Sequence, residues 1–79
     1  MEWKSVNVPQ GSRLFRNHRF SFMSRGANYS IEIDEQVDGN CSGHAELSND
    51  SSGTIPSVSG KDIKDCLQAV IKKIQEKYG

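Results

Sequence analysis

The chain has 79 residues, of which 34% are hydrophobic and 25% are charged, and ten basic residues balance ten acidic ones. This length predicts a single small domain, and its stability should be modest because such a chain buries only about 60% of the surface that its unfolded form exposes. A net charge of zero argues against a dedicated nucleic-acid-binding protein, which usually carries an overall basic field. It also removes the repulsion that would keep copies of the chain apart.

The sequence predicts neither a membrane span nor a secretory signal peptide. No run approaches the roughly 20 apolar residues that a membrane span requires, and the start lacks the apolar core of a signal peptide. Cys41 and Cys66 are the two cysteines, too few for a disulfide scaffold. We therefore predict a cytoplasmic protein with no membrane partner.

The N-terminal half predicts β-structure. Within the arm of residues 1–12, "WKSVNV" (3–8) predicts a short edge strand that Pro9 ends. Residues 13–48 predict a three-stranded antiparallel meander, because apolar and polar residues alternate in each of its three segments. Turns are expected at residues 24–28 and at the hairpin signal Asp38-Gly39.

The C-terminal third predicts a loop and a helix. Residues 49–58 begin with a serine- and glycine-rich run, and we predict that they form a flexible loop. In residues 59–78 the apolar positions recur every three or four residues, which predicts an amphipathic helix. Ser59 fits its N-cap, and Asp62 is expected in its first turn.

These elements predict an α+β fold of order β-β-β-α, with residues 3–8 as an additional edge strand and the helix on one face of the sheet. Gly43 and Ala45 are small, so we expect the helix to approach the third strand closely. The order of elements over residues 29–74 resembles the amino-terminal half of HicB-type antitoxins. That resemblance implies an antitoxin-like regulator.

His44-Ala45-Glu46 matches the first half of a zinc deaminase motif, whose second half is Pro-Cys-x-x-Cys. The only proline downstream is Pro56, and Ser57 follows it, so the ligands of a catalytic zinc are missing. A structural zinc site would need His18, Cys41, His44 and Cys66. Residues 41 and 44 point to opposite faces of a regular strand, so we expect no metal or cofactor, and buried cysteines.

The stretch "RLFRNHRF" (13–20) interleaves basic with apolar and aromatic residues. Two interpretations remain open. Arginines among aromatics can bind a phosphate backbone while bases stack on the rings. Alternatively, the arginines lie opposite Glu32, Asp34 and Glu35 of the next strand as cross-strand ion pairs, and we favour this structural interpretation.

No nucleophile elbow or phosphate-binding loop is present, and a thin domain is expected to offer little concavity, so we predict no enzyme. We predict a small non-catalytic protein-binding module, a homodimer that acts as an inhibitor, antitoxin-like regulator or adaptor through its open sheet face or edge strand. The alternative is an RNA- or single-stranded-DNA-binding domain that uses residues 13–25. The predicted partner-binding residues are Arg13, Arg16, Arg19, Met23, Arg25, Glu32, Asp34, His44 and Glu46.

Overall fold

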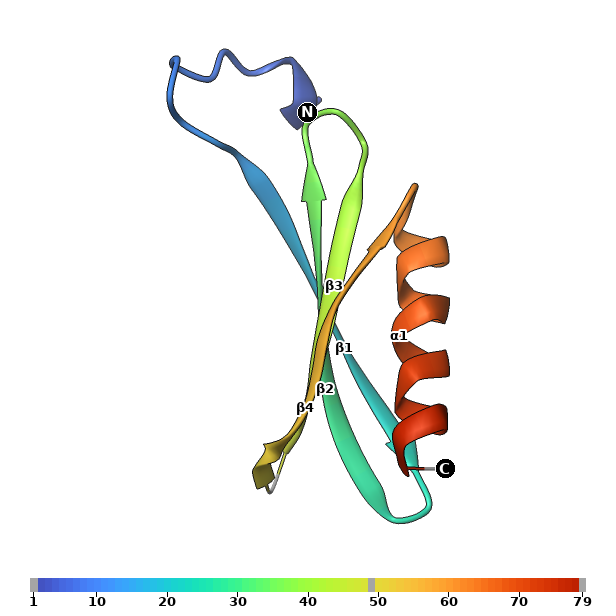
Figure 1. Ribbon diagram of the computed structural model, residues 1–79. Coiled ribbons are helices and arrows are strands. Elements are labelled where there is room, and N and C mark those ends of the chain that lie inside the picture. The colour runs from blue at the N-terminus through green and yellow to red at the C-terminus, as the bar shows by residue number, and fades with distance from the viewer. Residues whose placement is uncertain (1, 49, 79) are drawn as a thin grey trace.

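The computed structural model describes residues 2–48 and 50–78. Its elements are a short 3-10 helix η1 (Trp3–Ser5), four strands β1 (Phe15–Ser24), β2 (Ala27–Gln36), β3 (Cys41–Leu47) and β4 (Asp50–Gly60), and the helix α1 (Ile63–Tyr78). The strands form one antiparallel sheet in the order β1-β2-β3-β4, and α1 lies along one face of it (Figure 1). The predicted α+β arrangement of a meander and a C-terminal helix is confirmed.

Two tight turns set the register of the first three strands. Arg25 and Gly26 join β1 to β2 with φ angles of 51° and 80°, as a type I′ hairpin requires. Between β2 and β3, Gly39 has a φ of 96°, and the Asp38 carboxylate accepts a hydrogen bond from the Asn40 amide at 2.9 Å. Both turns lie where the sequence predicts them.

The core lies between α1 and the sheet. Alternate residues of β2 and β3 meet the apolar stripe of α1. The buried hydrophobic residues in the described part of the chain are Tyr29, Ile31, Ile33, Cys41, Ala45, Ile55, Cys66, Val70 and Ile74. A Cβ atom on Gly43 would lie 2.9 Å from Cys66 Sγ and 3.0 Å from Val70 Cγ2. The predicted close approach of the helix to the third strand is therefore confirmed.

The prediction of a flexible loop over residues 49–58 is wrong for the described residues, because Asp50–Gly60 form β4; residue 49 lies outside the described part. Val58 pairs with Gly43 and Ile55 with Ala45, so β4 contains one extra residue, a β-bulge. The bulge interrupts the alternation by which a strand is recognised in a sequence. Pro56 lies in this bulge, where its missing N–H costs little.

The predicted edge strand over residues 3–8 is also wrong. Residues 3–5 form η1 instead, since local hydrogen bonds stabilise a turn. The Glu2 carboxylate accepts a bond from the Lys4 amide at 3.1 Å, and the Ser5 hydroxyl donates to the Glu2 carbonyl at 2.8 Å. Such side-chain bonds compete with sheet pairing, so β1 is left as an edge of the sheet.

The helix begins later than predicted, and Ser59 is not its N-cap. Ser59 is still in β4, where it pairs with Ser42. Asp62 takes the cap position instead: its Oδ1 accepts a hydrogen bond from the Asp65 amide at 2.7 Å, and Asp65 Oδ2 accepts one from the Lys61 amide at 3.3 Å. These reciprocal bonds resemble a capping box.

We expect Asp62→Ala to lower the free energy of unfolding by about 1 kcal/mol, the usual cost of losing a cap. Ser59→Ala is the matched control, and it should change that free energy by less than about 0.5 kcal/mol. Urea denaturation of both variants measures the difference. A larger loss in Ser59→Ala than in Asp62→Ala would contradict the assignment of the cap.

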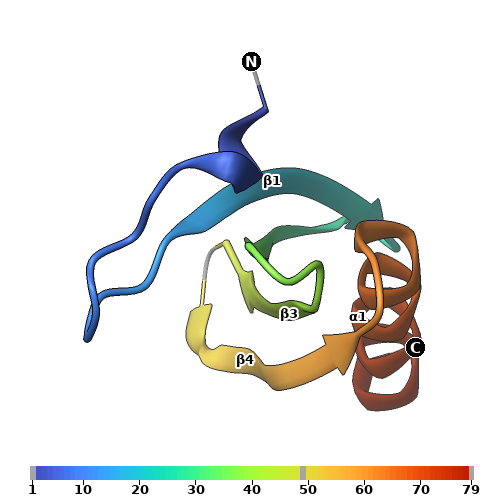
Figure 2. The ribbon, with the colours of Figure 1, turned by 90° about the horizontal axis from the view of Figure 1, so that it is seen from above.

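The helix is not centred on the sheet. Among the described residues, the backbone of α1 lies close to β2, β3 and β4 but not to β1, although Phe22 of β1 packs against the core. Figure 2 shows the curved sheet from above, with β1 and β4 at its two edges. The molecule measures 43 × 21 × 21 Å, and its radius of gyration is 14.0 Å, compared with about 12 Å for a compact chain of this length.

Candidate functional site

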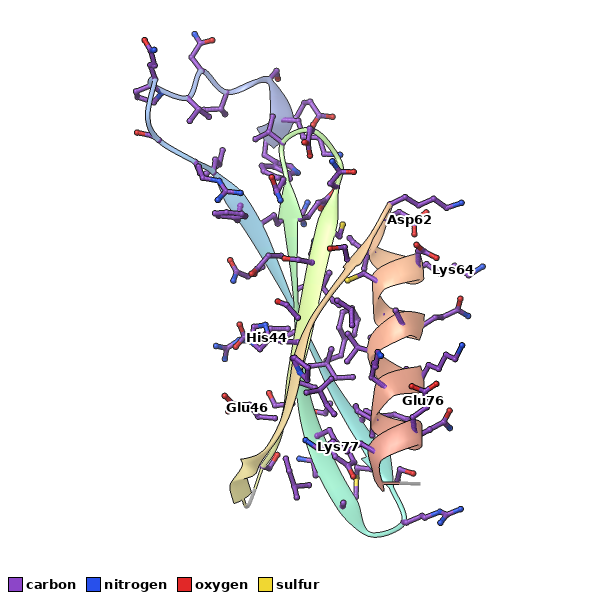
Figure 3. The ribbon with its side chains drawn as sticks, viewed as in Figure 1. His44, Glu46, Asp62, Lys64, Glu76 and Lys77 are labelled. Atoms are coloured by element: carbon purple, nitrogen blue, oxygen red, sulfur yellow. The ribbon has the colours of Figure 1, made fainter. Side chains whose placement is uncertain are left out.

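The face of the sheet opposite α1 is polar. His44 and Glu46 point away from the helix (Figure 3), and His44 lies opposite Glu32, which lies opposite Arg19. Six of the nine predicted binding residues share this open face by the register of the strands. They are Arg19, Met23, Glu32, Asp34, His44 and Glu46.

Donors on β1 match the carboxylates of β2. Arg19 Nη2 lies 3.1 Å from Glu32 Oε1, and Asn17 Nδ2 donates a hydrogen bond to Asp34 Oδ1 at 2.9 Å. The structural interpretation of the basic stretch is therefore confirmed for Arg19. Because the Arg19 side chain is largely exposed, this pair contributes less than about 1 kcal/mol to stability.

The other three predicted residues lie elsewhere. Arg16 is on the helix side of β1, opposite Glu35, and Arg25 is in the β1–β2 turn. The Arg13 guanidinium lies 4.9 Å from the centre of the Phe15 ring. By alternation, Phe15 and Arg19 share the open face, whereas Arg16 and Phe20 share the helix side. The basic and aromatic residues thus form no single stacking platform.

The two cysteines are separated from His44 by the sheet. Cys41 and Cys66 are free thiols in the core, whereas His44 is on the open face. Within the described ranges, no three potential metal-ligating side chains gather at one place. Burial raises the pKa of both thiols, which disfavours the reactive thiolate.

The predicted site includes Met23 but omits the phenylalanines that form an apolar surface with it on β1. We define the β1 strip as the outer edge of β1 with Phe20, Phe22 and Met23. Phe20 is 37% exposed and Met23 is 73% exposed. The centre of the Phe22 ring lies 6.1 Å from the centre of the Tyr29 ring. In the described part of the chain, β1 pairs only with β2. The sequence signal is "FSFM", which places large apolar side chains on both faces of one strand.

A hollow lies at the other end of β1, between the N-terminal arm and the β2–β3 turn. Its volume is about 490 Å³, and its apolar lining consists of Val6, Val8, Leu14, Phe15 and Val37. This volume exceeds the roughly 300 Å³ at which pockets for ligands usually start, but an open hollow does not enclose a ligand as such pockets do. The hollow is open to solvent and contains no cluster of catalytic groups.

Glu35 connects the arm to the sheet. Its Oε1 lies 3.0 Å from His18 Nε2, and its Oε2 lies 3.2 Å from Lys4 Nζ. The hydrogen bond with His18, helped by Lys4 and opposed by burial, lowers the pKa of the Glu35 carboxyl from 4.5. Glu35 therefore stabilises the fold more when it is ionised than when it is protonated.

Because the pKa of Glu35 is lower in the folded than in the unfolded state, its contribution is present above pH 4.5 and is lost as the pH falls through the folded value. We expect Glu35→Gln to lose less than about 1 kcal/mol of unfolding free energy at pH 6 and a smaller amount at pH 3. Urea denaturation at both pH values measures this. Glu46→Gln, on the open face, is the control; an equal pH dependence in both variants would contradict the role of Glu35.

The comparisons with known proteins give no family. No protein-family model, no curated protein and no solved structure matches the chain. The resemblance to HicB-type antitoxins therefore stays a prediction from the order of elements. Among the described residues, no helix has the length and apolar character needed to cross a membrane.

Proposed function

We propose that the protein is a small non-catalytic protein-binding module that acts as an inhibitor, antitoxin-like regulator or adaptor, and that it binds through the β1 strip. One observation supports this most strongly: β1 is a ten-residue edge strand whose backbone α1 does not approach closely. An unpaired edge offers a row of N–H and C=O groups to an added strand. We place the protein in the cytoplasm, where its two free thiols stay reduced.

The side chains of the β1 strip favour a protein partner over a nucleic acid. Phe20 and Met23 offer aromatic and thioether surface, the kind enriched at the centres of protein interfaces. Arg19 is already paired with Glu32, which reduces the positive charge available to phosphates. The complementary partner is an extended segment with apolar residues at alternate positions.

A pull-down from native lysate tests this function, with bound protein and nucleic acid both identified. Phe20→Lys places a charge in the β1 strip, and Gln75→Lys adds the same charge on the exposed surface of α1. We expect the same identified protein with wild type and Gln75→Lys, at low and high salt, and its loss with Phe20→Lys. Recovery of nucleic acid alone, released at high salt, would support the RNA- or single-stranded-DNA-binding alternative instead.

A further inference from the structure

We propose, in an inference that rests on the proposed function, that the strand added to β1 is the β1 of a second copy. Two identical antiparallel strands are related by a two-fold axis perpendicular to the sheet. Both α1 helices then lie on the same face, and the two uncovered strands lie side by side between them. The result is an eight-stranded sheet in which each copy covers the exposed edge of the other.

The side chains of β1 favour a register with Ser21 on the two-fold axis. In this register Phe20 of each copy faces Phe22 of the other, on the helix side of the sheet. Two cross-strand aromatic pairs therefore form where α1 leaves the sheet uncovered. On the open face, Met23 faces Arg19 of the other copy, whose methylene groups can cover the thioether.

Charge is compatible with this register. Arg19 faces Met23 and Arg16 faces Gly26, so no charged side chain lies opposite another. A register centred on Phe20 would bring the two Arg19 side chains within about 8 Å of each other across the strands, whereas in the Ser21 register the diagonal like-charged neighbour of Arg19 is Arg25 of the other copy, which lies in the β1–β2 turn. Arg19 is paired with Glu32 in its own copy, and the chain has no net charge, so a second copy meets little repulsion.

An engineered disulfide tests the register. Directly opposed residues of antiparallel strands have Cα atoms about 4.5–5.5 Å apart, which suits a disulfide. Ser21→Cys should therefore give a covalent dimer under mild oxidation. Asn17→Cys is the matched control on the same face of β1, because its two copies would lie about 27 Å apart and should not cross-link. Cys41 and Cys66 are buried and give a low background in wild type.

Sedimentation equilibrium tests the dimer itself. We expect a mass of about 17.6 kDa, twice the 8.8 kDa chain, and a dissociation constant raised at least about 30-fold by Phe20→Lys. Met23→Lys is a second variant that should weaken the dimer. Because the Met23 side chain is 73% exposed in the single chain, this variant should fold as wild type does. Circular dichroism checks the fold of both.

A monomeric wild type, dimers that both variants leave intact, or equal cross-linking of Ser21→Cys and Asn17→Cys would each overturn this inference. Failure of the proposed function would give different results from failure of the dimer. If wild type is monomeric but Phe20→Lys still loses an identified protein partner, the β1 strip binds a different protein and only the second copy is excluded. If Phe20→Lys retains that partner, the β1 strip is not the binding surface for it.

Discussion

Ile31→Ala should lower the free energy of unfolding by about 4 kcal/mol. Ile31 is fully buried at the middle of β2, where it lies opposite Phe20 on one side and Ala45 on the other. Truncation removes three buried carbon atoms and leaves a cavity that the flanking strands cannot fill. Because a chain of this length has a total stability of only about 4–12 kcal/mol, the variant should be close to unfolding at room temperature.

Urea denaturation followed by circular dichroism measures this loss. Val6→Ala is the control, since Val6 is apolar but 49% exposed, and its truncation should cost less than about 0.5 kcal/mol. Equal effects of the two substitutions would mean that the helix does not cover the centre of β2.

Gly60→Ala should destabilise the protein by about 3 kcal/mol, at the upper end of what overpacking costs. A Cβ atom at residue 60 would lie 2.7 Å from the backbone nitrogen of Cys66 and 2.8 Å from its Cα. Backbone cannot rotate away as a side chain can, so the first turn of α1 would have to move away from β4. We expect α1 to be less stable and the midpoint temperature of thermal unfolding to fall. Circular dichroism measures both.

Gly43→Ala is the matched comparison. Its Cβ would meet the ends of side chains, the nearest being Ile33 Cδ1 at 2.7 Å. These atoms can shift, so we expect a smaller loss of about 1–2 kcal/mol, reduced further in an Ile33→Val background that lacks Cδ1. A greater loss in Gly43→Ala than in Gly60→Ala would contradict the tight contact between β4 and α1.

The parts of the fold that the sequence predicts are those with an uninterrupted period. Tyr29, Ile31 and Ile33 alternate with polar residues without a break, and the apolar residues of α1 recur every three or four positions. In β4, by contrast, the bulge puts two residues between Ile55 and Val58 where regular pairing would put one, and serine and glycine have little intrinsic preference for strands. This strand is stabilised by pairing with β3, which no local pattern reveals.

The candidate site was predictable where it depends on the parity of residues in a strand. Parity assigns His44 and Glu46 to the open face, and it would have assigned Arg16 to the other side of β1 with Phe20. The β1 strip was not predictable, because its exposure follows only once β4 is recognised as a fourth strand. A helix about 10 Å wide covers two or three strands spaced about 4.8 Å apart, so it can cover a three-stranded meander but not a four-stranded sheet.

The elongated outline of the molecule affects how its mass should be measured. A particle about twice as long as it is wide experiences more friction than a sphere of equal volume and therefore diffuses more slowly. On a gel-filtration column calibrated with globular standards, a single chain would elute early and resemble a larger species. Light scattering and sedimentation equilibrium are independent of shape, and they are the appropriate methods for counting chains.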